Sequence, residues 1–263
     1  MLKRINLQSK NDLASDTIVF LHGNSSSLKV FGGVLQANQL NHKLLAMDLP
    51  GHGSSYRSDD PKNDYSIANY KKEILKVIEE HGTGSILLVG NSLGGHLSIE
   101  LAGLVKNLAG LLIFGSPPVK SPLNPNEAFL PNEGLSLFLS AQSEPEFKKR
   151  ILSSLCRQEK DVALIIEDFD NTDPEARAVF GQSLGTPNEG FGDEFSMLKN
   201  SAVQKFVIQG SNEPSVSLEY LKQHQKELRY ELIEIPECGH YPTLDQPEFF
   251  LQHLTRIAQL SLR

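Results

Sequence analysis

The segment Gly90-Asn91-Ser92-Leu93-Gly94-Gly95 carries one serine among glycines, and its two flanks differ in character. Residues 85–89 before it form a short apolar run with the length and β-branching of a buried strand. Residues 96–105 after it are apolar and helix-like, without proline. A G-x-S-x-G pattern between a strand and a helix is typical of a nucleophile elbow, a sharp turn that lifts the serine hydroxyl above the sheet edge. The pattern alone also fits an ordinary glycine-rich loop, so the rest of the chain has to separate the two readings.

The composition indicates a single globular α/β domain. The chain has 263 residues, of which 39% are hydrophobic and 22% charged, which is an ordinary balance for a folded protein. A net charge of −7 argues against nucleic acid or an anionic membrane as a partner. The first ten residues lack the apolar core of a secretory signal, and no apolar run has transmembrane length. We therefore expect a cytoplasmic protein in which Cys156 and Cys238 stay reduced.

Strand-like and helix-like segments alternate along most of the chain, which predicts a mostly parallel sheet with right-handed crossovers. The predicted strands are residues 17–21, 43–47, 85–89, 108–114, 205–209 and 230–235, with at most a short edge strand in the first ten residues. The predicted helices are residues 30–40, 66–81, 96–105, 217–228 and 248–260.

Residues 117–200 break this alternation, because they are rich in proline and contain no strong strand. Short helical pieces are predicted there at residues 135–141, 146–155, 162–169 and 174–184. Asp173 or Thr172 would cap the last of these, with Pro174 at its first position. We therefore predict a core domain of residues 1–116 and 201–263, with residues 117–200 as a helical cap.

Three polar residues follow different predicted strands, at the end where ligands bind to open parallel sheets: Ser92, Glu213 and His240. A serine is a poor nucleophile until a base takes its proton, and an imidazole titrates near neutral pH unaided. Glu213 would bond the other ring nitrogen of His240 and stabilise the imidazolium. Taken singly, each residue could be an ordinary loop residue. The other acids that could serve His240 are Asp168, Asp170 and Glu237.

With these residues in place, the chain resembles the α/β-hydrolase-fold superfamily over essentially its full length. The matching motifs are His22-Gly23-Asn24, Asp48-Leu49-Pro50-Gly51-His52-Gly53-Ser54-Ser55, residues 90–95 and Gly239-His240. The resemblance implies the α/β-hydrolase fold and an oxyanion hole made by the backbone N–H groups of Leu93 and Asn24. His22 and His52 are interpreted as structural. Glu213 stands where that superfamily usually has aspartate.

A closer resemblance is to the α/β-hydrolase-type N-acyl-homoserine lactone lactonases. It rests on residues 22–27, 48–53, 92–96, 115–118 and 212–214, and a glutamate acid is part of it. Asn91 differs from the bulky aromatic residue associated with that group. The cap would offer apolar side chains to an acyl chain, although most of them could instead pack the cap: Phe129, Leu130, Leu135, Phe138, Phe147, Ile151 and Phe180. The expected substrate contacts are Asn24, Phe138, Ile151 and Tyr241.

The sequence thus predicts a serine hydrolase that cleaves a carboxylic ester or a lactone through Ser92, His240 and Glu213. No cofactor or metal is expected, because no G-x-G-x-x-G follows a strand and no His-x-His-x-Asp-His run occurs. A small-molecule ester or lactone is the expected partner. A general carboxylesterase and a carbon–carbon bond hydrolase share the same triad and stay as alternatives. A third alternative is a ligand receptor without catalytic activity.

Overall fold

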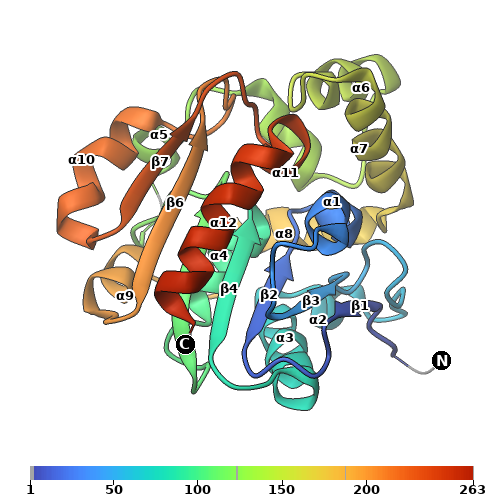
Figure 1. Cartoon of the computed structure of the whole chain (residues 1–263). Coiled ribbons are helices and arrows are strands. Elements are labelled where there is room, and N and C mark those ends of the chain that lie inside the picture. Colours follow the sequence, from blue (N-terminus) through green and yellow to red (C-terminus); the bar gives the residue numbers. More distant parts are fainter. Residues whose placement is uncertain (1–2, 123, 187, 263) are drawn as a thin grey trace.

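The computed structural model describes residues 3–122, 124–186 and 188–262, and it contains a seven-stranded sheet with helices on both faces (Figure 1). The strand order is β1-β3-β2-β4-β5-β6-β7. Only the β1–β3 pair is antiparallel among these strands. The strands are β1 (Leu7–Lys10), β2 (Thr17–Leu21), β3 (Lys43–Met47), β4 (Ile86–Asn91), β5 (Leu108–Phe114), β6 (Gln204–Gly210) and β7 (Glu231–Ile235). The predicted mostly parallel sheet is confirmed.

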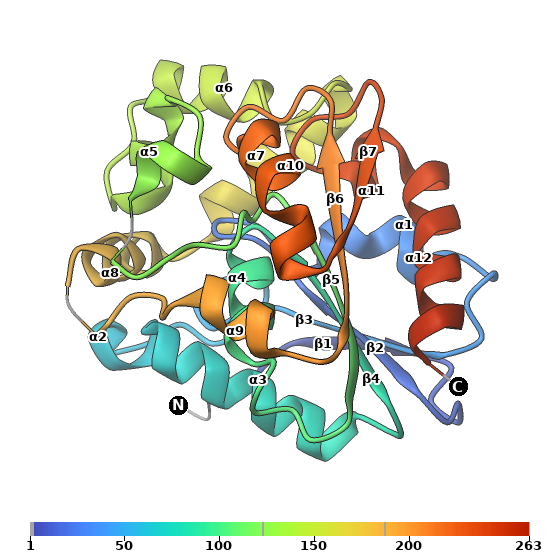
Figure 2. The same cartoon turned by 90° about the vertical axis from the view of Figure 1, so that its left-hand side faces the viewer.

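Side chains alternate between the two faces of the sheet and form two cores. In β2, Ile18 and Phe20 pack with α1 (Gly32–Gln36) and α12 (Pro247–Ser261). Val19 and Leu21 pack on the other face, with α3 (Ile67–His81), α4 (Leu93–Glu100) and α10 (Leu218–Leu228). Figure 2 shows α1 and α12 on one side of the sheet and α3, α4 and α9 on the other. Both faces are covered, which explains why the central strands are continuous apolar runs.

Most predicted elements have the expected bounds, but two helices outside the insertion differ. The helix predicted for residues 30–40 is a 3-10 turn, η1 (Leu28–Phe31), followed by the short α1. The Ser27 hydroxyl caps η1 by accepting the Lys29 N–H, so the turn begins early. The bounds 96–105 were also wrong. α4 begins at Leu93, because the Ser92 carbonyl already accepts the N–H groups of Gly95 and His96.

The segment between β5 and β6 contains helices and no strand of the sheet in its described residues. They are α5 (Pro125–Ala128), η2 (Glu133–Leu139), α6 (Pro145–Ser153), α7 (Glu159–Asn171), α8 (Pro174–Gly185) and α9 (Glu194–Asn200). α5 and α9 were not predicted, and η2 is a 3-10 helix. Asp173 caps α8 as expected, accepting the Glu175 N–H, with Pro174 at the first position. In Figures 1 and 2, α6 and α7 lie together beyond one end of the sheet.

The remaining elements are short. They are α2 (Pro61–Asp64), which leads into α3, and α11 (Pro242–Asp245), which leads into α12. Cys156 and Cys238 are both buried and form no disulfide. Within the described ranges, no helix combines the length and the apolar character needed to cross a bilayer.

Gly94 is required by the close approach of α4 to β2, and we expect Gly94→Ala to destabilise the protein. A Cβ at Gly94 would lie 2.1 Å from the carbonyl oxygen of Leu21, a backbone atom that cannot move without disturbing β2. The free energy of unfolding in urea should fall by about 3 kcal/mol or more. Gly33→Ala in α1 is the matched control, because a Cβ there meets nothing within 4 Å. Equal stabilities of the two variants would contradict this packing argument.

Candidate active site

Ser92 occupies a sharp turn between β4 and α4. Its backbone has φ 50° and ψ −118°, a region that L-residues rarely adopt and that costs about 1–3 kcal/mol. Two hydrogen bonds hold this conformation. The Ser92 N–H donates to the Phe114 carbonyl at 2.8 Å, and the Ser116 hydroxyl donates to the Ser92 carbonyl at 2.8 Å. The turn therefore has the geometry expected of a nucleophile elbow.

His240 and Glu213 form a buried pair at the ends of the last two strands. Glu213 follows β6 and His240 follows β7, and each residue is 8% exposed. The His240 Nδ1 and the Glu213 Oε2 are 2.8 Å apart. Because a carboxylate only accepts hydrogen bonds, this contact places the proton on Nδ1 of the neutral ring and leaves Nε2 as the basic nitrogen.

Ser215 fixes the other oxygen of the Glu213 carboxylate. Its backbone N–H and its hydroxyl both donate to Oε1, at 2.9 and 2.6 Å. These bonds leave Oε2 to His240, so they set the rotation of the carboxylate. The sequence analysis missed Ser215. A serine two residues after an acid is a common turn pattern, and that was the only available signal.

The protonation of the pair follows from its surroundings. Burial alone would raise the pKa of Glu213, but the His240 imidazole and the two Ser215 donors outweigh it and hold that pKa below its usual value. Burial alone would lower the pKa of His240, but the Glu213 carboxylate outweighs it and raises that pKa above 6.5. The carboxylate therefore stabilises the imidazolium, as the acid of a triad does.

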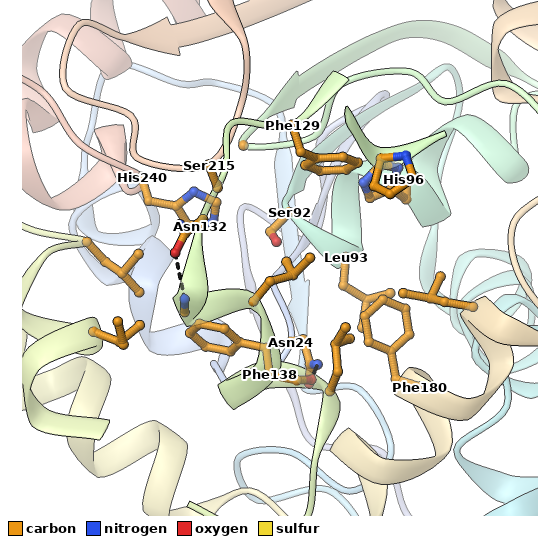
Figure 3. A pocket seen from close by; sticks show the side chains of 18 of the residues that line it. Asn24, Ser92, Leu93, His96, Phe129, Asn132, Phe138, Phe180, Ser215 and His240 are labelled. Atoms are coloured by element: carbon orange, nitrogen blue, oxygen red, sulfur yellow. Dashed lines mark hydrogen bonds between the residues drawn. The ribbon is translucent and has the colours of Figure 1, made fainter. Parts of the chain in front are cut away.

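Ser92 and His240 line one cavity of about 130 Å³, whose wall is mostly apolar (Figure 3). All four expected substrate contacts lie in its wall: Asn24, Phe138, Ile151 and Tyr241. Of the other apolar candidates, Phe129, Leu135 and Phe180 line it as well. Leu130 and Phe147 are absent from its wall. Leu130 is 41% exposed, and Phe147 packs against the core that contains α1 and α12.

The backbone N–H groups of Leu93 and Asn24 donate no hydrogen bond to any residue that the structure describes. Leu93 is the first residue of α4, where N–H groups have no partner within the helix. Asn24 is 7% exposed and lies in the loop after β2. Its side-chain amide donates to the Phe138 carbonyl of η2 at 2.6 Å. The loop is thus joined to the helical segment above the cavity.

His22 and His52 are absent from the cavity wall. The His22 Nε2 accepts the Leu49 N–H at 2.9 Å, and its Nδ1–H donates to the Gly23 carbonyl at 2.7 Å. His52 is completely buried, and its Nδ1 lies 3.0 Å from the Pro50 carbonyl. Burial lowers the pKa of both rings. These contacts agree with a structural role for both histidines.

The three rival acids have other partners. Asp168 accepts a hydrogen bond from the Ser27 hydroxyl at 2.7 Å, and burial raises its pKa to about 6. Asp170 pairs with Lys148, and Glu237 pairs with Arg157. None of these acids contacts His240. In the described part of the chain, no group of three or more His, Cys, Asp or Glu side chains is arranged to hold a metal ion.

The chain is similar to known proteins in sequence and in structure. The crystal structure of N-acyl homoserine lactonase AidH complexed with N-butanoyl homoserine superposes with a TM-score of 0.88 at 25% identity, covering 99% of this chain and 95% of that one. The pimeloyl-[acyl-carrier protein] methyl ester esterase of Nitrosomonas europaea is 25% identical over 244 residues, 89% of this chain and 92% of its own length. The model of the alpha/beta hydrolase family matches residues 18–253. Its match includes β3 to β7, the turn at Ser92 and the His240 loop, and the chain therefore belongs to the alpha/beta hydrolase family.

Proposed function

We propose that the protein is a serine hydrolase that cleaves a carboxylic ester or a lactone, with Ser92 as nucleophile, His240 as base and Glu213 as acid. The observation that carries the proposal is the 2.8 Å contact between His240 and Glu213, with His240 and Ser92 lining the same cavity. The strained turn at Ser92 supports it, because such strain persists at functional sites where the fold over-determines it.

In the proposed mechanism the His240 Nε2 takes the proton of the Ser92 hydroxyl as its oxygen attacks the substrate carbonyl. The Leu93 and Asn24 amides donate to the oxyanion, each with an effect of about 3–4 kcal/mol on the transition state at comparable sites. The C–O bond then breaks, and the imidazolium gives its proton to the leaving oxygen. Water, deprotonated by the same nitrogen, attacks the acyl-serine and releases the acid. With a lactone, the leaving alcohol stays attached to the acyl group throughout, so the product is a single hydroxy acid.

We propose that residues 117–200 act as a cap over Ser92, on a core of residues 1–116 and 201–263. The cap supplies Phe138 and Ile151 to the cavity, and the core supplies Asn24 and Tyr241. The mostly apolar wall of this cavity suits an apolar acyl chain, since ligand pockets combine apolar walls with a few polar groups that fix orientation.

N-acyl homoserine lactones are the substrates we favour within this class. The support is the similarity to AidH over nearly the whole of both chains, together with the glutamate at position 213. A linear ester is the second candidate, supported by the similarity to the methyl ester esterase. Incubation with N-acyl homoserine lactones of different chain lengths, beside methyl esters of the same acids, separates the two. Turnover of the esters alone would exclude the lactone assignment.

The hydrolase proposal is tested by covalent labelling. A fluorophosphonate probe should react with the wild-type protein, and mass spectrometry of peptides should place the adduct on Ser92. The Ser92→Ala variant should stay unlabelled under the same conditions. A probe that labels neither protein would favour a ligand receptor, and one that labels both equally would exclude Ser92 as the nucleophile.

The activity should depend on pH in a direction set by Glu213. His240 acts as a base only when neutral, and its raised pKa means that it becomes protonated already above pH 6.5. The kcat/KM for an ester should therefore fall as the pH is lowered, with half of the maximum reached at a pH above about 6.5. In Glu213→Gln the raising influence is gone and burial prevails, so the half-maximum of the residual activity should move to lower pH. An unchanged profile in that variant would contradict the assigned pair.

A further inference from the structure

A second histidine–glutamate pair lies beside the same cavity, with its histidine in the cavity wall, and has no part in the mechanism above. His96 belongs to α4, and its Nδ1 lies 2.9 Å from both carboxylate oxygens of Glu194 in α9. The His96 ring faces the cavity and stacks on Phe191, with ring centroids 4.6 Å apart. Phe129 lies on another side of it, with a centroid distance of 6.4 Å. His96 is thus a polar side chain between two phenylalanines of the cavity wall, Phe129 and Phe191.

Glu194 determines which ring nitrogen is available. Its side chain is completely buried, and it also accepts the Val119 N–H at 3.0 Å. The His96 Nδ1 therefore donates to a carboxylate that has no access to water. The other nitrogen, Nε2, makes no hydrogen bond to any residue in the described part of the chain. Nε2 accepts a hydrogen bond when the ring is neutral and donates one when it is charged, so a hydroxyl group suits both states.

The position of His96 determines which end of a bound substrate it can contact. Its N–H bonds the Ser92 carbonyl, so the two residues are one helical turn apart, about 6 Å along the axis of α4. Figure 3 shows His240 on one side of Ser92 and His96, beside Phe129, on the other. In the proposed mechanism the leaving oxygen stays near His240, which protonates it. The acyl group then extends away from His240, and His96 lies on that side of Ser92.

We propose that His96, oriented by Glu194, is a specificity-determining residue that recognises a hydroxyl group on the acyl chain, near the carbonyl that Ser92 attacks. This inference rests on the proposed function and concerns its linear-ester candidate, because in an N-acyl homoserine lactone the carbonyl that Ser92 attacks belongs to the ring and not to the acyl chain. A hydroxyl on the third acyl carbon has a reach comparable with the backbone offset of about 6 Å between Ser92 and His96 along α4. Its oxygen lies about 3–4 Å from the carbonyl carbon, and a hydrogen bond of about 3 Å to Nε2 spans the remaining distance. An unsubstituted chain leaves Nε2 without a partner in an apolar pocket, which is unfavourable.

The test compares ethyl butanoate with the two enantiomers of ethyl 3-hydroxybutanoate in a pH-stat. Each kcat/KM is divided by the rate of hydroxide-catalysed hydrolysis of the same ester, which removes differences in intrinsic reactivity. The wild-type protein should prefer one hydroxy ester roughly three- to tenfold. His96→Phe keeps an aromatic ring against Phe191 and removes the nitrogen, so the ratio should fall to about one. Phe147→Leu is the control, because Phe147 is absent from the cavity wall and its change should leave the ratio as in wild type.

The outcomes separate this inference from the proposed function. Turnover that depends on Ser92, with a ratio near one in wild type, overturns the role of His96 and leaves the hydrolase standing. The same holds if the ratio persists in folded His96→Phe. Absence of any turnover that depends on Ser92 overturns both. If His96→Phe fails to fold with Glu194 buried opposite a phenyl ring, the double variant His96→Phe/Glu194→Gln replaces it, because Gln still accepts the Val119 N–H. The wild-type ratio is decisive in any case.

Discussion

Ser92→Ala is expected to lower kcat for short p-nitrophenyl esters by about 10⁶-fold, the scale of loss when a triad nucleophile is removed. The reason is that the mechanism passes through a covalent acyl-serine, and no other hydroxyl in the elbow lies at its strained position. The Ser92 side chain makes no hydrogen bond that holds the turn, which depends on the Ser92 N–H and carbonyl. The variant should therefore fold normally, and its loss of activity should result from the missing nucleophile and not from misfolding.

Ser98→Ala in the same helix is the control for this substitution. The Ser98 hydroxyl is buried and bonds the Gly94 carbonyl at 2.7 Å, and the residue is absent from the cavity wall. Ser98→Ala should keep most of the wild-type kcat, with at most a small change in the thermal midpoint. Turnover by Ser92→Ala at a few per cent of wild type or more would exclude Ser92 as the nucleophile.

Glu213→Gln is expected to lower kcat by about 10⁴-fold, as the analogous change does in serine proteases. Glutamine keeps the size of the side chain and can still accept the Ser215 donors. It carries no charge to stabilise the imidazolium, and its NH₂ group can turn toward the His240 Nδ1 and favour the wrong tautomer. The measurement is kcat at a pH well above the His240 pKa, so that the pH effect is not counted twice.

Two further variants are compared with Glu213→Gln to test the assignment of the acid. Asp168→Asn alters a buried acid that does not contact His240, so it should leave kcat within a few-fold of wild type. Ser215→Ala removes one of the two donors to Oε1 and keeps the other, so a loss of roughly three- to tenfold is expected. If Asp168→Asn were inactive and Glu213→Gln nearly as active as wild type, the triad acid would be Asp168 and not Glu213.

The sheet was predictable because most of its strands are short apolar segments that can be identified from the local sequence. Residues 17–21, 43–47 and 108–114 are apolar runs of strand length, and the structure has strands with those bounds. The helix bounds were less predictable, since tertiary contacts set them. α4 begins at Leu93 and contains Gly94-Gly95 in its first turn despite the low helix propensity of glycine, because the helix packs directly on β2. Residues 133–139 form a 3-10 helix whose first turn is capped by the Asn132 side chain, and periodicity alone does not predict this helix type.

The site was predictable only where one residue carries the chemistry. Ser92, Glu213 and His240 each follow a strand, and parallel strands bring their carboxyl ends to one edge. Pairs that join distant parts of the chain left no pattern in the sequence. Glu194 meets His96 across the packing of α9 on α4, 98 residues apart in sequence. The cytoplasmic location stays a prediction.

The hydrogen bond from the Asn24 side chain to the Phe138 carbonyl couples the conformation of the loop after β2 to that of η2. It ties the loop that carries a proposed oxyanion donor to η2, so the ordering of η2 and the ordering of that loop share one free energy. Such a coupling acts in both directions with equal size. An anion that occupies the oxyanion position should therefore slow amide hydrogen exchange in residues 133–139, and an acyl group bulky enough to push η2 outward should reduce kcat as well as affinity.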